Sequence, residues 1–239
     1  MARAITPNPK ARILVVDDHT MVRDGLARLI NSQSDLICSG EAANVQEAQA
    51  AAAACQPDLA IVDLRLKAED GLELIKSLRS QFADLRILVL SQYDSKLYVE
   101  RALRAGALGY VLKEQAADEV LQAIRVVLGG EVYLTRAMAA LLLHQFVGAG
   151  PEAPRTGLEK LTDTELHVLQ LLGAGLSTRE IAAEVRRSFK TIETHRENIK
   201  SKLGLKGAAE LVHYATQWAQ QMVSVPQDTI EGLERPRDA

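Results

Sequence analysis

Short apolar runs alternate with segments of helical spacing throughout the first 130 residues of the chain. Five runs rich in Ile, Leu and Val have the length of strands, at residues 13–16, 36–40, 59–62, 87–90 and 110–112. Between these runs, apolar residues recur at helical spacing, and the regular alternation is typical of βαβ units. Because no Gly-rich dinucleotide fingerprint follows the first run, the pattern predicts an α/β domain with a flavodoxin-like, doubly wound, five-stranded parallel sheet.

Polar side chains stand at the ends of four of these runs. They are Asp17 and Asp18, then Asp63, Ser91 and Lys113. Because parallel strands end at the same edge of a sheet, we expect these side chains to line one crevice. Three carboxylates, a hydroxyl and an ammonium suit a divalent cation and a phosphoryl group. The alternative for the two adjacent aspartates is a pair that caps the next helix.

The second half of the chain has a different organisation. A helical stretch at 135–146 precedes the segment 148–157, whose three glycines and two prolines are typical of a linker. The pattern from 158 to about 223 is all helical, and Thr162-x-x-Glu165 and Ser177-x-x-Glu180 form two capping boxes. We therefore divide the chain into an α/β domain at 11–130, a linker helix and flexible linker at 131–157, an all-α four-helix domain at 158–223, and a tail at 224–239.

Charge is distributed unevenly along the chain, whose net charge is −3. Residues 10–130 hold 14 basic and 17 acidic residues, whereas residues 179–206 hold eight basic and four acidic residues. This division fits a cation-binding module joined to a polyanion-binding one. No apolar run approaches the roughly 20 residues that span a membrane, and residues 1–10 lack the apolar stretch of a secretory signal. We expect a cytoplasmic protein with two buried, reduced thiols at Cys38 and Cys55.

Six segments carry a resemblance to a known family. In the first domain they read ILVVDDH (13–19), DLAIVDLRL (58–66), VLS (89–91) and AGALGYVLK (105–113). In the second they read LTDTELHVLQLLGAGLSTREIAAEV (161–185) and KTIETHRENIKSKLGL (190–205). Over roughly residues 11–221 the chain resembles a NarL/FixJ-type two-component response regulator, which joins a receiver domain to a LuxR-type helix-turn-helix.

The resemblance implies a role for each polar residue of the crevice. Asp63 would be the phosphoacceptor, because an ionised carboxylate can attack phosphorus without a base. Mg²⁺ would be ligated by Asp18, Asp63 and the backbone carbonyl of Arg65, with Asp17 acting through a bound water. Lys113 and Ser91 would contact the phosphoryl oxygens. His19 follows the acidic pair, but we do not expect it to be a ligand, because Mg²⁺ prefers oxygen.

Tyr110 occupies the position at which the receiver family carries a switch aromatic, paired with Ser91. The alternative is a tyrosine at the sheet edge with its hydroxyl in solvent. Two departures from the family concern access and kinetics: Leu66-Lys67 stands where many receivers have Met-Pro, and Gln92 stands where a small residue is usual.

The resemblance places a recognition helix over Phe189–Lys202, in the major groove of double-stranded DNA. Basic residues of this helix are the best candidates for phosphate contacts, and acids at two positions suggest contacts to cytosine amino groups or weaker affinity. The candidate DNA-binding residues are Lys190, Thr191, Glu193, Thr194, Arg196, Glu197, Lys200 and Lys202. The alternative is a solvated helix face, although its like-charge pairs at a spacing of four residues make that a poor helix design.

The resemblance implies a transcription factor that a sensor histidine kinase phosphorylates at Asp63. When active it would bind DNA as a homodimer, with Trp218 and Tyr214 of the helix 208–221 in the interface. Alternatively, both aromatics cap the helical core. A phosphohydrolase with an aspartyl-phosphate is the competing enzyme class, but haloacid-dehalogenase phosphatases carry Asp-x-Asp after the first strand, and here Asp-Asp-His stands there. A regulator that binds DNA regardless of phosphate is a third hypothesis.

Overall fold

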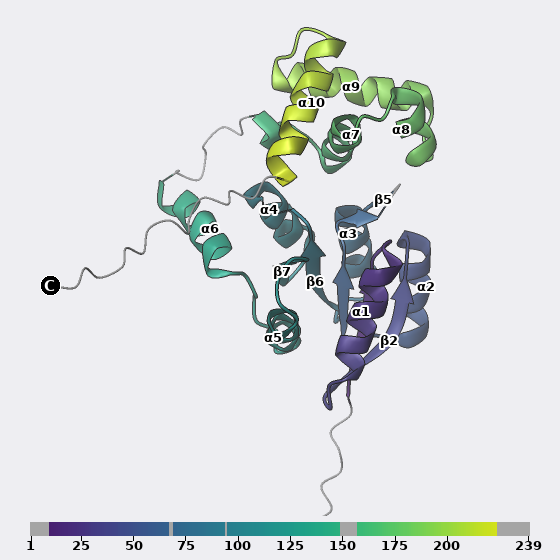
Figure 1. Ribbon diagram of the computed structural model, residues 1–239, viewed down its shortest axis with the longest axis vertical. Coiled ribbons are helices and arrows are strands. Elements are labelled where there is room, and N and C mark those ends of the chain that lie inside the picture. The colour runs from purple at the N-terminus through teal and green to yellow at the C-terminus, as the bar shows by residue number, and fades with distance from the viewer. Residues whose placement is uncertain (1–9, 67–68, 94, 149–156, 224–239) are drawn as a thin grey trace, which may run out of the picture.

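The computed structural model describes residues 10–66, 69–93, 95–148 and 157–223 of the chain, which form two domains (Figure 1). The first domain holds a sheet of five parallel strands in the order β2-β1-β3-β6-β7. The strands are β1 (Ala11–Val16), β2 (Leu36–Ala42), β3 (Leu59–Val62), β6 (Arg86–Ser91) and β7 (Gly109–Leu112). The predicted flavodoxin-like doubly wound sheet is thereby confirmed.

Helices cover both faces of this sheet because the side chains of each strand alternate between the two faces. The helices are α1 (Thr20–Asn31), α2 (Val45–Cys55), α3 (Gly71–Gln81), α4 (Lys96–Ala105) and α5 (Ala117–Leu128). On one face of the sheet, Ile13 and Val15 of β1 pack in a cluster with α1 and α5. On the other face, Leu14 and Val16 pack in a cluster with α2, α3 and α4.

Two details differ from the sequence analysis. The loop after Asp63 contains a small antiparallel hairpin, β4 (Arg65–Leu66) and β5 (Glu69–Asp70), which the sequence did not predict because strands of two residues show no periodicity. Cys38 and Cys55 are free thiols, but both are half-buried rather than buried.

The second domain is all helical. After α6 (Arg136–Gly148) come a short 3-10 helix, η1 (Gly157–Lys160), then α7 (Asp163–Gly173), α8 (Thr178–Glu184), α9 (Phe189–Leu203) and α10 (Ala208–Val223). Both predicted capping boxes are present, at the starts of α7 and α8. Most of the linker expected at 148–157 and the tail expected from 224 lie outside the described residues.

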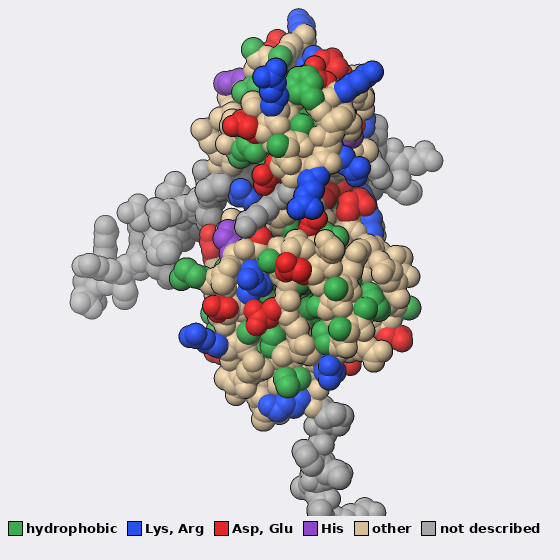
Figure 2. Space-filling view, turned by 90° about the vertical axis from the view of Figure 1, so that its right-hand side faces the viewer, with side chains coloured by type: hydrophobic (Ala, Val, Ile, Leu, Met, Phe, Trp, Pro, Cys, Tyr) green, Lys and Arg blue, Asp and Glu red, His purple; other side chains and the backbone are tan. Residues whose placement is uncertain are grey.

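The second domain lies beyond the end of the sheet toward which the strands point (Figure 1). Its helices α7 and α10 face the first domain, whereas α9 lies on the far side (Figure 1). In the space-filling view, acidic and basic side chains gather where the two lobes meet (Figure 2). Among the described residues, no helix is long and apolar enough to cross a membrane.

Candidate functional site

The carboxyl edge of the sheet brings together the acidic residues and the lysine that the sequence singled out. The side chains of Asp17 and Asp63, which follow β1 and β3, are only 1% and 3% exposed. Oxygens of Asp17, Asp18 and Asp63 and a ring nitrogen of His19 all lie within 4.8 Å of one another. Lys113, which follows β7, places its Nζ 2.5 Å from Asp17 Oδ2 and 2.6 Å from Asp63 Oδ2. The predicted convergence of these groups is therefore real.

The electrostatics of this cluster favour a cation. Burial raises the pKa of Asp63 to about 6, although Lys113 acts in the opposite direction. Burial also tends to lower the pKa of Lys113, but the carboxylates of Asp63 and Asp17 outweigh it and the pKa is raised. One ammonium cannot balance three carboxylates at such short range. A compact set of hard oxygen donors with excess negative charge fits a divalent ion such as Mg²⁺.

The start of α1 decides between two interpretations of the adjacent aspartates. Its N-cap residue is His19, and no side chain caps the helix. Asp17 Oδ1 instead accepts a hydrogen bond of 2.9 Å from the backbone N–H of His19, and the His19 ring lies 2.8 Å from Asp18 Oδ1. The two carboxylates are therefore turned into the cluster and not toward the orphan N–H groups of the helix.

The loop after Asp63 approaches the site closely. The backbone N–H of Arg65 donates to Asp63 Oδ1 at 3.1 Å, so this segment is fixed beside the carboxylate. At Gly71, a Cβ atom would lie 2.5 Å from the carbonyl oxygen of Asp63, which only glycine permits. The first turn of α3 thus holds the chain after Asp63 in place. The carbonyl of Arg65 as a metal ligand stays a prediction.

Ser91 and Tyr110 both form hydrogen bonds with Tyr93, a residue that the sequence analysis did not single out. Ser91 is fully buried at the end of β6, and its Oγ accepts a hydrogen bond of 3.2 Å from the N–H of Tyr93. Tyr110 is also fully buried, and its hydroxyl donates to the Tyr93 carbonyl at 2.7 Å. The alternative of a solvent-exposed Tyr110 hydroxyl is thus wrong. The Tyr93 ring in turn stacks on Tyr98 of α4, with ring centroids 4.6 Å apart.

The candidate DNA-binding residues lie on α9, where they differ in exposure and in partners. Lys190, Glu193, Thr194 and Glu197 are exposed, whereas Thr191, Arg196, Lys200 and Lys202 are half-buried. Three of the four basic residues have partners inside the domain. Arg196 donates to Thr178 Oγ1 of α8, Lys200 lies 2.8 Å from Glu197, and Lys202 lies 2.6 Å from the buried Glu165 of α7.

Comparison with known proteins accounts for both halves of the chain. Residues 13–125 match the family of response regulator receiver domains, and residues 159–215 match the bacterial regulatory proteins of the luxR family. The oxygen regulatory protein NreC of Staphylococcus carnosus is 36% identical over 208 residues, which cover 85% of this chain and 96% of NreC. The chain belongs to the NarL/FixJ-type response regulators.

Two solved structures share this architecture. A two-component response regulator of the LuxR family from Aurantimonas sp. is 32% identical, with a TM-score of 0.55, over 58% of this chain and 99% of that chain. RcsB of Salmonella typhimurium is 23% identical, with a TM-score of 0.68, over 91% of this chain and 100% of its own. RcsB shows the similarity of fold alone.

The two domains of this response regulator meet in a polar and aromatic contact that the sequence analysis did not predict. Arg101 of α4 donates to Asp163 at 2.5 Å and to the carbonyls of Leu161 and Leu158 at 2.7 and 3.2 Å. Lys76 of α3 also reaches Asp163, at 2.6 Å. Because Asp163 is the first residue of α7, Arg101 and Lys76 of the receiver both hold the start of this helix.

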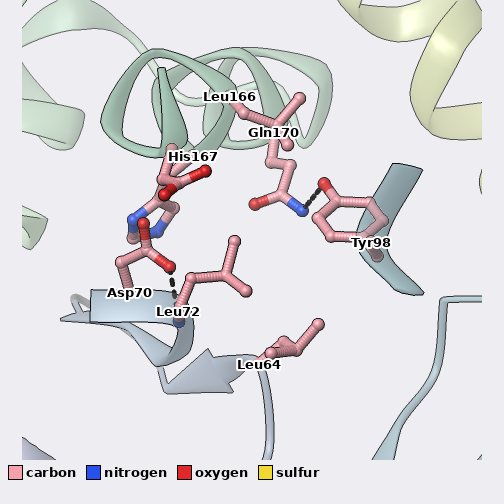
Figure 3. Close-up of a pocket in the computed structure, with 8 residues that line it drawn as sticks. Leu64, Asp70, Leu72, Tyr98, Leu166, His167 and Gln170 are labelled. Atoms are coloured by element: carbon pink, nitrogen blue, oxygen red, sulfur yellow. Dashed lines mark hydrogen bonds between the residues drawn. The ribbon is translucent and has the colours of Figure 1, made fainter. Parts of the chain in front are cut away.

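A small pocket lies beside this contact, between the two domains (Figure 3). Gln170 of α7 points to Tyr98 and donates a hydrogen bond to its hydroxyl, and the Tyr98 ring lies 6.4 Å from that of Trp218 on α10. On the other side of the pocket, His167 lies beside Asp70 (Figure 3). Burial raises the pKa of Asp70 to about 6, against a hydrogen bond from the Leu72 N–H.

Proposed function

We propose that this response regulator accepts a phosphoryl group on Asp63 from a sensor histidine kinase and then acts on double-stranded DNA as a dimeric transcription factor in the cytoplasm. The chain would be a phosphoacceptor and transcription regulator, not an enzyme. The observation that carries the proposal is the position of Asp63, buried beside Lys113 and within reach of Asp17 and Asp18. The receiver domain would span residues 11–130 and the DNA-binding domain residues 158–223.

The residues of the cluster divide the chemistry among them. Asp18, Asp63 and the carbonyl of Arg65 would hold Mg²⁺, with Asp17 acting through a water, and the ion would offset the repulsion between a carboxylate and an anionic phosphoryl group. With a pKa of about 6, Asp63 is mostly ionised at neutral pH and is ready to attack phosphorus. A new O–P bond forms as the bond from phosphorus to the kinase's histidine nitrogen breaks. Lys113 then pairs with the phosphoryl oxygens.

Tyr93 is placed to carry this event to the second domain. A phosphoryl group on Asp63 is an acceptor for the hydroxyl of Ser91, which now accepts from the N–H of Tyr93. Movement of Ser91 toward the phosphoryl group would free Tyr93, which also receives the Tyr110 hydroxyl and stacks on Tyr98. Tyr98 in turn contacts Gln170 and Trp218 of the DNA-binding domain. The stack Tyr93–Tyr98–Trp218 would therefore be the element that phosphorylation biases.

Control would act on assembly rather than on access to the recognition helix. Helix α9 lies on the far side of its domain from the receiver, whereas α10 faces the receiver (Figure 1). Trp218 of α10 is only 6% exposed in this arrangement. Release of the receiver would uncover the α10 face, including Trp218 and Tyr214, for a second copy of the chain. Two recognition helices would then fit an inverted-repeat site, while one covers too few base pairs for specificity.

Phosphorylation of the full-length chain by acetyl phosphate and Mg²⁺ tests the proposal, with intact mass spectrometry as the measurement. We expect one added phosphoryl group, and none in Asp63→Asn. Asp58→Asn is the matched control, because Asp58 is an aspartate before β3 that bonds the backbone N–H of Arg12 outside the cluster. A phosphoryl group that persists in Asp63→Asn would refute the assignment.

A further inference from the structure

The C-terminus of α8, immediately before the recognition helix, has a well-defined hydrogen-bond pattern. The N–H of Arg187 donates to the carbonyl of Ala182 at 3.0 Å, and the N–H of Arg186 donates to that of Ala183 at 3.3 Å. Arg186 has a left-handed backbone, with φ of 51°. These features define a Schellman motif. In this motif the residue with the left-handed backbone is usually glycine, and the residue after it is commonly apolar.

Two other helices of the same domain end in this motif with the favoured residues. After α7, Gly175 (φ 88°) and Leu176 close the motif by bonds to Leu172 and Leu171. After α9, Gly204 (φ 71°) and Leu205 close it by bonds to Ser201 and Lys200. The α8 motif carries arginine at both positions, and both side chains are exposed. Arginine at these two positions therefore makes the end of α8 less stable than the Gly-Leu sequence would.

The basic side chains at this turn are free to bind a ligand. Arg186, Arg187 and Lys190 are exposed, and none of their side chains forms an ion pair or a hydrogen bond with another described residue. The nearest acids along the chain, Glu184 and Glu193, do not pair with them among the described residues. By contrast, the three basic residues farther along α9 all have side-chain partners: Arg196 and Lys202 on other helices of the domain, and Lys200 on α9 itself. Three cations within five residues therefore face solvent at the entry to α9.

We infer that Arg186, Arg187 and Lys190, which we call the turn patch, bind phosphates of the DNA backbone beside the groove that α9 enters. This inference rests on the proposed DNA-binding function and assigns it two arginines outside the recognition helix. A local rule broken without a packing gain is typical of a functional position. Two guanidinium groups offer planar, paired donors that match phosphate oxygens. Because phosphate contacts position a protein without reading bases, the turn patch fixes the register of α9 on any duplex.

The test restores the favoured residues and asks whether stability and DNA binding change in opposite directions. In the full-length chain, Arg186→Gly with Arg187→Leu reproduces the Gly-Leu sequence of the α7 and α9 motifs. The expected result is a thermal midpoint of the DNA-binding domain that rises by a few degrees. Affinity for a fluorescein-labelled duplex of mixed sequence, measured by anisotropy, falls several-fold. The slope of log K against log salt becomes shallower by about two units, roughly 0.9 for each lost phosphate contact.

Two control variants separate the causes. Gln56→Gly introduces glycine at the left-handed end of α2 (φ 42°) in the receiver, so it relieves backbone strain without touching the turn patch. Arg28→Gln removes one exposed cation from α1, so it reports the effect of net charge alone. Both controls should keep the wild-type salt slope. Unchanged affinity and slope in the double variant would overturn the turn patch, as would a lower thermal midpoint. A wild-type chain that binds no duplex after phosphorylation with acetyl phosphate and Mg²⁺ would overturn the proposed function with it.

Discussion

Replacement of Arg101 by alanine should release the DNA-binding domain from the receiver without phosphorylation. The Arg101 side chain is 10% exposed, and its guanidinium makes three hydrogen bonds to the second domain, one to Asp163 and two to backbone carbonyls. A hydrogen bond with a charged partner contributes about 1.5–3 kcal/mol, but water replaces these partners when the domains separate. Since Lys76 still pairs with Asp163, we expect docking to weaken by about 2–3 kcal/mol, or roughly 30- to 150-fold.

Trp218 is the only tryptophan of the chain and reports this docking directly, because it is 6% exposed and lies beside Tyr98. Undocking should shift its emission to the red and increase quenching by acrylamide. Arg101→Glu, which places two acids in contact, should show the full effect. Arg104→Ala is the matched control on the same helix, since its side chain is 64% exposed and, among the residues that the structure describes, pairs only with Glu100, at 3.4 Å. If both Arg101 variants retain the wild-type emission and quenching, Arg101 does not hold the two domains together.

Three further predictions concern stability. Asp70→Asn should raise the free energy of unfolding at pH 7.5 by up to about 3 kcal/mol and flatten its pH dependence, measured by urea unfolding. Because the pKa of Asp70 is raised to about 6, the folded chain keeps a proton between about pH 4 and 6 that the unfolded chain releases. The free energy of unfolding of the wild type therefore falls as the pH rises through this window. If the variant keeps the full pH dependence of the wild type, the unpaired oxygen of Asp70 is not buried. The raised pKa of Asp63 also makes stability fall with rising pH, and this part of the dependence should remain. Lys202→Met should cost about 2–3 kcal/mol in the same assay by leaving the 2%-exposed Glu165 without its cation, whereas the exposed Lys190→Met should change stability by less than about 0.5 kcal/mol. Thr162→Ala should lower stability by about 1 kcal/mol through loss of the α7 cap, and Thr162→Ser should be close to neutral.

The sheet and its acidic edge could be predicted because local patterns specify them. Each core strand is a short apolar run, and the polar residue that follows it must lie at the common carboxyl edge once the strands are parallel. Asp63 and Lys113 are 50 residues apart in the sequence, yet their contact at 2.6 Å follows from topology alone. Helix ends were equally accessible where a capping box or a glycine stands, as at Thr162 and Gly204.

The contacts between the domains could not be predicted in the same way. Arg101 and Asp163 are 62 residues apart, Tyr98 and Gln170 are 72 apart, and no periodicity connects either pair. The sequence also left open which cations of α9 are available, because the partners of Arg196 and Lys202 lie on α8 and α7. One feature of the sequence did point to the contact between the domains. In a chain with only 4% aromatic residues, tyrosines at 93, 98 and 110 and a single tryptophan suggest a specific contact.

In the proposed mechanism, a phosphoryl group on Asp63 controls dimerisation and thereby DNA binding. The most direct measurement is the affinity of the full-length chain for a duplex carrying its inverted-repeat site, selected from a random pool, with and without acetyl phosphate and Mg²⁺. Light scattering on the same samples gives the dimer fraction. We predict that phosphorylation raises both affinity and dimer fraction, and that Asp63→Asn stays monomeric and weakly bound under both conditions. Equal affinity of the wild type with and without the phosphodonor, matched by Asp63→Asn, would rule out this mechanism and indicate a regulator that binds DNA regardless of phosphate.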